Sequence, residues 1–335
     1  MLRLPRFEFH QPSSVREALE IRAAAGAGSS YVAGGTDLYP NMKRRQTTPG
    51  TVISLARIGE LGGGGRSDAA ITRRPDGGLD VGACVTLADL AAHEDVRTSY
   101  PAVAEAAELV STPLLRNMGT IGGNLLLDTR CNYFNQGFEW RRAINFCMKK
   151  DGEICWVAPS SPRCWAVQSS DGVPVAVALG AEVSLASTAG TRRIPVAALY
   201  RNDGIEYLTK QPDELLTTYH LPAPDGWKAS YVKLRRRGAF DFPVLGVAAW
   251  LKFARDETVE DARIVLGAVA SYPMTVDSAA HALIGAKPGS ESIAAAADAA
   301  YKPAKPMDNT DFTLSWRKEM VRVYVRRALE RLSPG

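Results

Sequence analysis

The sequence offers few of the residues from which enzymes commonly build a catalytic centre. Its four histidines, His10, His93, His220 and His281, are far apart and form no pair with the spacing of metal ligands. Cysteine is scarce as well, with five in 335 residues, and the odd total leaves at least one thiol unpaired in any disulfide scheme. We therefore assign no catalytic residue to this chain.

The sequence also lacks the signals of export and membrane insertion. The start, MLRLPRFEFHQP, has neither the apolar core nor the small-residue cleavage site of a signal peptide. No charge-free apolar run approaches the roughly 20 residues of a membrane-spanning helix. Lys and Arg total 40 against 36 acidic residues, a net charge of +4 that does not suggest a nucleic-acid binder. We expect a cytoplasmic protein that binds neither membrane nor nucleic acid.

The cysteines that are present cluster in one segment. Four of the five, Cys131, Cys147, Cys155 and Cys164, follow the pattern C-x15-C-x7-C-x8-C. Because a reducing compartment disfavours disulfides, metal ligation is the better explanation. The spacing matches neither a zinc ribbon nor a compact ferredoxin motif. A zinc ion, an iron–sulfur cluster and a chance cluster of buried thiols remain open, whereas Cys84, in the middle of a predicted strand, is expected to be a small buried residue.

Local signals divide the chain near residues 222–228, where PAPDGWK has the composition of a linker. Before it, strands alternate with helices, and Ser14 and Thr86 are expected to cap helices in capping boxes with Glu17 and Asp89. The predicted strands lie within 30–38, 51–55, 79–85 and 173–185, and a helix covers 101–110. After the linker, strand-like runs over 243–253 and 261–270 precede helices, the last over 316–332.

Two glycine turns, at residues 33–38 (AGGTDL) and 119–124 (GTIGGN), are the strongest binding motifs. Glycine lets the backbone approach an anion closely, and Thr36, Thr120 and Asn124 add side-chain donors, so a diphosphate is a suitable ligand. Neither turn fits the Rossmann or P-loop spacing. Taken alone, each is also compatible with a plain tight turn.

Together, these motifs resemble the FAD-binding medium subunit of the molybdenum hydroxylase (xanthine oxidase) superfamily, with A-G-G-T-D-L at 33–38 and R-N-x-G-T-I-G-G-N at 116–124. The likeness covers nearly the whole chain. It implies an α+β protein with a two-part FAD-binding domain over residues 1–222, of the vanillyl-alcohol-oxidase (PCMH) kind. A smaller α+β domain with an antiparallel sheet and helices would follow over residues 223–335.

The resemblance also implies the FAD-binding residues. Loop residues would hold the diphosphate and ribose, and three residues from a looser alignment would add further flavin contacts. The full set is Val32, Ala33, Gly34, Gly35, Thr36, Asp37, Leu38, Ser111, Thr120, Gly122, Gly123 and Asn124, with Asp171, Leu216 and Lys233 from the looser alignment.

Residues 128–170 form an insertion relative to ordinary members of this superfamily, and the insertion resembles the β subunit of 4-hydroxybenzoyl-CoA reductase. That resemblance implies a [4Fe-4S] cluster on the four clustered cysteines. It makes the chain the electron-carrying subunit of a reductase that removes the aromatic hydroxyl of its substrate. The partners would be a molybdenum-cofactor subunit, a [2Fe-2S] subunit and a low-potential, ferredoxin-like donor, in a dimer of heterotrimers.

Two other functions remain open for the chain. One is the medium subunit of an oxidising molybdenum hydroxylase that acts on a purine, an aldehyde or another aromatic. The other is a zinc-stabilised interaction module without redox function. The basic residues Arg141, Arg142, Lys149 and Lys150 are expected either to steer an acidic ferredoxin or to form a solvated loop surface.

Overall fold

The computed structural model describes residues 2–65 and 67–333, and its strands form three sheets. The N-terminal sheet is parallel and has the order β1-β3-β2. Its elements are β1 (Glu8–His10), α1 (Val15–Ala25), β2 (Ser29–Val32), α2 (Leu38–Lys43) and β3 (Thr51–Ser54). The predicted cap at Ser14 is confirmed, because its side chain accepts a hydrogen bond from Glu17 N and α1 begins at the next residue.

The second sheet is antiparallel and has the order β4-β5-β8-β6-β7. Its strands are β4 (Ile71–Arg73), β5 (Leu79–Gly82), β6 (Glu182–Ser187), β7 (Gly190–Pro195) and β8 (Leu215–Leu221). Between β5 and β6 the chain forms α3 (Leu87–Ala92), α4 (Glu94–Ser99), α5 (Pro101–Leu109), α6 (Pro113–Arg116), α7 (Ile121–Leu125), α8 (Phe138–Ala143) and α9 (Gly172–Leu179). The cap predicted at Thr86 starts α3.

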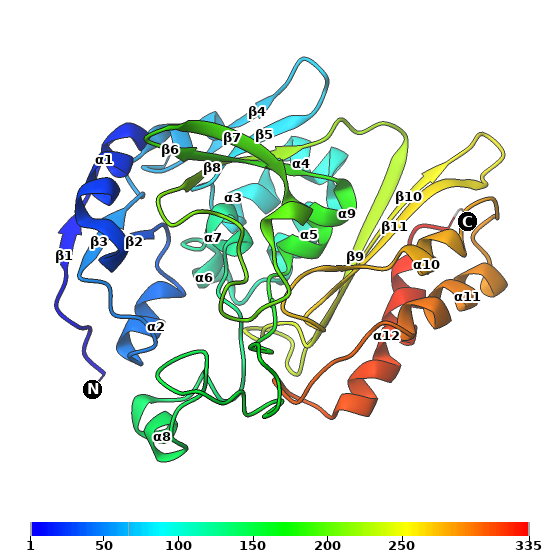
Figure 1. Ribbon diagram of the computed structural model, residues 1–335. Helices are drawn as coiled ribbons and strands as arrows, with labels where there is room; N and C mark the ends of the chain where they lie inside the picture. The colour runs from blue at the N-terminus through cyan, green and yellow to red at the C-terminus, as the bar shows by residue number, and fades with distance from the viewer. Residues whose placement is uncertain (1, 66, 334–335) are drawn as a thin grey trace.

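The third sheet is antiparallel and has the order β12-β11-β10-β9. Its strands are β9 (Trp227–Leu234), β10 (Leu245–Phe253), β11 (Val259–Gly267) and β12 (Met274–Thr275). One face packs against α10 (Asp277–His281), α11 (Ser290–Tyr301) and α12 (Leu314–Glu330), as Figure 1 shows. The opposite face contributes Tyr231, Trp250 and Val265 to the core that surrounds α5 and α9. These two helices thus lie between two sheets.

The sequence predicts one buried strand over residues 173–185, and this prediction is wrong for the first half of the segment. The structure has the helix α9 over Gly172–Leu179 and only then the strand β6. Every residue from Val173 to Leu179 is buried, so the apolar run carries no alternation that distinguishes a buried helix from a buried strand. Gly180, with a φ of 70°, ends the helix in the left-handed conformation.

The residues of the insertion, 128–170, form turns and the short helix α8, which lies away from the sheets in Figure 1. We call residues 128–170 the cysteine segment. Arg130 and Val167 exchange backbone hydrogen bonds of 2.8 and 2.7 Å and so close its base. A small core of Cys131, Phe134, Cys147, Cys164 and Ala166 fills it.

A fully buried arginine, Arg317 on α12, joins four parts of the C-terminal region. Its guanidinium donates to the carbonyls of Val244, Ala268 and Met307 and to Asn309 Oδ1. Asn309 in turn donates to Trp165 O in the cysteine segment. The start of α12 is therefore connected to that segment through Asn309.

The predicted α+β class is confirmed, with a two-part region followed by a smaller region built on an antiparallel sheet. The boundary between residues 222 and 223 stays a prediction. Among the described residues, no helix combines the length and hydrophobicity that crossing a membrane requires.

Candidate functional site

A cavity of about 740 Å³ lies where the two glycine turns meet. This volume falls in the range of cofactor sites. Of the fifteen residues predicted to bind FAD, all but Lys233 line the cavity. The structure thus brings together residues that are far apart in the sequence, from Val32 at the end of β2 to Leu216 in β8.

The turns touch each other so closely that only glycine fits. A Cβ atom on Gly34 would lie 1.7 Å from the carbonyl oxygen of Met118, and one on Gly122 would lie 2.7 Å from the oxygen of Ala83. Gly35 has a φ of +70°, which L side chains rarely adopt. At these glycines the wall of the cavity is therefore bare backbone, as close contact with a diphosphate requires, while other residues of the turns, such as Thr36 and Asn124, add side chains.

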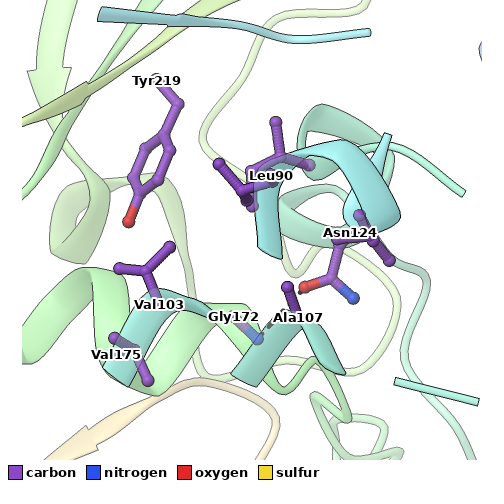
Figure 2. A pocket seen from close by; sticks show the side chains of 9 residues that line it. Leu90, Val103, Ala107, Asn124, Gly172, Val175 and Tyr219 are labelled. Carbon is purple, nitrogen blue, oxygen red and sulfur yellow. Dashed lines mark hydrogen bonds between the residues drawn. The ribbon is translucent and has the colours of Figure 1, made fainter. Parts of the chain in front are cut away.

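The hydroxyl and amide of the second turn are partly used within the protein. Thr120 caps α7 by accepting from Gly123 N at 3.2 Å. Asn124 Oδ1 accepts from Ser170 Oγ at 2.6 Å and from Gly172 N at 3.1 Å, and Figure 2 shows the latter contact. The O–H of Thr120 and the Nδ2 group of Asn124 therefore remain available to a ligand as donors.

Asn124 also borders a small space in the core, which is no second binding site. Leu90, Val103 and Val175 line this space as well, and its volume is about 10 Å³. Figure 2 shows these side chains around it. Such a space holds at most one water-sized probe, so no cofactor group enters there.

Asp171 lines the cavity, and Lys233 lies behind it. Lys233 Nζ donates to Asp171 Oδ2 at 2.9 Å and to Leu109 O at 2.9 Å, and Tyr231 Oη donates to Asp171 Oδ1 at 2.8 Å. Burial raises the pKa of Asp171 and lowers the pKa of Lys233, while their mutual attraction opposes both shifts. Lys233 therefore contributes to the cavity by holding Asp171.

Charge is almost balanced within the cavity wall, since each of the six acidic residues that line it has a basic partner. The pairs are Asp37 with Arg130, Asp128 with Lys149, Asp171 with Lys233, Glu214 with Arg192, Asp241 with Arg237 and Asp311 with Arg236. Two basic residues of the wall, Arg44 and Lys210, pair with no carboxylate in the described part of the chain. Their charge is available to an anionic ligand.

Burial affects both of these cations. It lowers the pKa of Arg44, and it lowers the pKa of Lys210 to about 8. The Lys210 ammonium donates to the carbonyls of Gln211 and Glu214, each at 2.8 Å. Sequence reasoning missed Arg44, Lys210 and Arg130 as cavity residues, because only the fold brings them to the cavity.

The four clustered cysteines are buried and close to one another. Cys155 lies against Cys164, and the hydrogen bond between the thiols lowers the pKa of Cys155 to about 5 and raises that of Cys164. Burial raises the pKa of the Cys131 thiol to about 11. Within residues 2–65 and 67–333, no three ligating side chains converge closely enough to hold a single metal ion. Cys84 is buried, as expected.

The prediction for the basic residues of this segment is wrong for two of the four. Arg141 is 1% exposed and donates to Arg44 O, and Lys149 donates to Asp128, Thr129 and Gly204 O. Both side chains therefore support the segment from within rather than face a partner. Arg142 is exposed, and Lys150 is half-buried.

Comparison with known proteins agrees with this geometry. Residues 5–224 match the family described as the FAD binding domain in molybdopterin dehydrogenase, and residues 229–332 match the CO dehydrogenase flavoprotein C-terminal domain. The chain is 32% identical to the aldehyde oxidoreductase FAD-binding subunit PaoB of Escherichia coli K12, over 92% of this chain and 93% of that protein. It is 27% identical to the carbon monoxide dehydrogenase medium chain of Hydrogenophaga pseudoflava, over 97% of this chain and 96% of that protein.

The solved structures give the same result. Carbon monoxide dehydrogenase from Hydrogenophaga pseudoflava superposes with a TM-score of 0.80 over 98% of each chain, at 27% identity. The predicted two-part fold with its smaller C-terminal part is thereby confirmed. The chain belongs to the FAD-binding medium subunits of the molybdenum hydroxylase (xanthine oxidase) family.

Proposed function

We propose that this chain is the electron-carrying FAD subunit of an aldehyde-oxidising molybdenum hydroxylase. The observation that carries the proposal is the 740 Å³ cavity lined by both glycine motifs of the family. The aldehyde substrate rests on the 32% identity to a protein named as an aldehyde oxidoreductase FAD-binding subunit. A more distant relative, at 23% identity, is named as a glyceraldehyde dehydrogenase medium chain.

In this function the chain works with two partners. A molybdenum-cofactor subunit would oxidise the substrate, and a [2Fe-2S] subunit would pass the electrons to FAD. Bound FAD supplies an acceptor that takes electrons from one-electron carriers. We infer the dimer of heterotrimers from the family resemblance alone.

The protein's own residues would hold FAD at defined places. The backbone of Gly34, Gly35 and Gly123 would contact the diphosphate, because their wall carries no side chains. Arg44 and Lys210 would supply the positive charge that this anion needs, since every other cation of the wall is already paired. Leu216 would provide an apolar contact for a ring.

We further propose that Cys131, Cys147, Cys155 and Cys164 hold a [4Fe-4S] cluster. The support is the set of four buried thiols in a segment with only a small core of its own, which a metal centre would help to order. Lys149 and Arg141 lie near the thiols and would offset the negative charge of a thiolate-bound cluster. A zinc ion is the competing occupant, and it would require the thiols to lie closer together than the described residues place them.

The 4-hydroxybenzoyl-CoA reductase favoured by the sequence analysis receives less support than the oxidising alternative. The relatives above are named as an aldehyde oxidoreductase, a carbon monoxide dehydrogenase and a glyceraldehyde dehydrogenase. A ferredoxin-like donor belongs to the reductase direction. Arg141 and Lys149 could not steer such a donor to the chain, because both side chains are buried.

The cofactors are tested by purifying the full chain without air and measuring FAD, iron, acid-labile sulfide and zinc per polypeptide. We expect one FAD and about four irons and four sulfides. The variant Cys147→Ser should lose most of the iron and sulfide, and Cys84→Ser, outside the segment, should retain them. Stoichiometric zinc without sulfide would assign the cysteines to a structural zinc site and contradict the cluster.

The substrate is tested by producing the chain together with its two partner subunits. Adding an aromatic or aliphatic aldehyde without oxygen should bleach the flavin absorbance near 450 nm, on the order of the full FAD content. Xanthine and carbon monoxide serve as alternative substrates. If neither aldehyde bleached the flavin and the complex removed the hydroxyl of 4-hydroxybenzoyl-CoA with a low-potential reductant, the reductase would be the better assignment.

A further inference from the structure

Arg130 stands at the boundary between the cysteine segment and the FAD cavity. Its backbone pairs with Val167 at the base of the segment, and it precedes Cys131 in the chain. Its side chain lines the cavity, although the residue is only 8% exposed. One residue thus belongs to both candidate cofactor sites.

The guanidinium of Arg130 is only partly satisfied by the protein. It forms an ion pair with Asp37, the aspartate of the A-G-G-T-D-L turn, and lies 4.6 Å from the centre of the Phe242 ring. Its Nε is buried without a hydrogen-bond partner among the described residues. A buried N–H that finds no acceptor is costly, so a bound cofactor that draws the guanidinium towards it and supplies an acceptor would be favoured.

Two more contacts connect the cysteine segment to the chain that follows the A-G-G-T-D-L turn. Gln46 Nε2 donates to Phe134 O at 2.5 Å, and Arg141 Nη2 donates to Arg44 O at 2.8 Å. With the Arg130–Asp37 pair, these bonds hold both ends of α2 against the segment. The position of the flavin-binding turn therefore depends on the order of the cysteine segment.

We propose that Arg130 donates directly to bound FAD and that the cysteine segment fixes its position, so that metal loading of the cysteines and FAD binding strengthen each other. The coupling part rests on the proposed cluster, whereas the contact with FAD does not. Coupling between two binding events is reciprocal, so FAD should also favour retention of the metal centre.

The contact is tested by titrating the FAD-stripped full chain with FAD and following flavin fluorescence. Arg130→Gln should weaken FAD binding about ten- to a hundred-fold, the usual cost of a hydrogen bond to a charged group. Arg130→Lys should recover part of the loss. Arg142→Gln is the matched control, because Arg142 lies in the same segment with its side chain 64% exposed and, among the described residues, its one ion pair is with the neighbouring Glu139. Circular dichroism identifies any variant that fails to fold.

The coupling is tested with a double-mutant cycle that adds Cys147→Ser. In the wild-type background, the loss of iron should weaken FAD binding about ten-fold. In the Arg130→Gln background, it should weaken binding less than about two-fold. If the loss of iron weakened FAD binding by the same factor in both backgrounds, the coupling through Arg130 would be refuted.

The outcomes separate this inference from the proposed function. Wild-type FAD affinity in Arg130→Gln would overturn the direct contact whatever the metal content. A chain that contains neither iron nor sulfide would refute the cluster and the coupling together. In that case the Arg130→Gln titration on the same metal-free chain would still decide the contact with FAD.

Discussion

Lys233 Nζ lies 2.9 Å from Asp171 Oδ2, in an ion pair whose side chains are 1% and 4% exposed. The pair joins the residue that precedes α9 to the strand β9, and so connects the cavity wall to the third sheet. Removing one partner of such a pair leaves an uncompensated buried charge.

We expect Lys233→Met to lower the free energy of unfolding by about 3–5 kcal/mol. Asp171→Asn combined with Lys233→Met should cost less, because no charge is then left alone. Urea unfolding of the FAD-free protein measures both. Lys252→Met is the control, since Lys252 pairs with Asp225 at the surface and its loss should change the free energy of unfolding little. If Lys233→Met and the control lost the same free energy of unfolding, the buried pair would contribute no more than a surface pair.

The contact between the glycine turns predicts a sharp effect of one methyl group. Gly34→Ala should push the turn away from Met118 and weaken FAD binding at least about ten-fold, because the added Cβ meets backbone that cannot rotate aside. A fluorescence titration with FAD measures the change. Gly28→Ala, whose Cβ meets nothing within 4 Å, should bind FAD normally. If both variants bound alike, the close approach would have no role in binding.

The cation Lys210 predicts a pH dependence. Because burial lowers its pKa to about 8, the ammonium loses its charge as pH rises through and above 8, and FAD affinity should fall over that range. An anionic ligand raises this pKa in the complex, so the affinity should fall from about pH 8 up to the higher pKa of the complex and then level off. Affinity measured from pH 7 to 10 checks this, and Lys210→Met should bind weakly with a flatter profile.

The same pKa shift has the opposite effect on folding. The unfolded chain, with an ordinary lysine pKa of 10.5, holds the proton more tightly than the folded chain. The contribution of Lys210 to stability is therefore unfavourable below pH 8 and improves as pH rises from about 8 towards 10.5. An FAD-free protein whose stability showed no such contribution relative to Lys210→Met would contradict the burial of this group.

Arg317 provides a prediction about the cysteine segment. Arg317→Met should leave the carbonyls of Val244 and Ala268 without their donor and lower the free energy of unfolding by about 3 kcal/mol or more. The iron content should fall as well, since Asn309 loses its hydrogen bond from Arg317 and then holds the cysteine segment less firmly. Arg322→Met, on the exposed side of α12, is the control and should change neither quantity much.

Short-range signals in the sequence were sufficient for much of the fold. Ser14 and Thr86 cap helices as predicted, because a cap involves residues only three apart. The glycine turns likewise locate the cavity, since their backbone freedom is a property of the residues themselves. The run from Val173 to Leu179 was misread because a helix buried on all sides lacks the polar face that gives a helix its period.

The rest of the site depends on contacts that no local pattern encodes. Arg44, Arg130 and Lys210 reach the cavity only through the packing of distant segments. Arg141 and Lys149 resemble surface residues in the sequence, yet carbonyl oxygens of remote residues hold them inside. Lys233 falls at a family position for a flavin contact, but its ammonium is used by Asp171 and Leu109.

The path from Arg317 through Asn309 to Trp165 has a consequence for biosynthesis. Asn309 O also accepts from Asn132 N, so a residue far downstream in the sequence holds the cysteine segment at two points. A ribosome makes the cysteines well before it makes α12, and domains take shape as the chain emerges. We therefore expect the cysteine segment to reach its final packing only once Asn309 and α12 have been made, so that any metal centre would be inserted after that point.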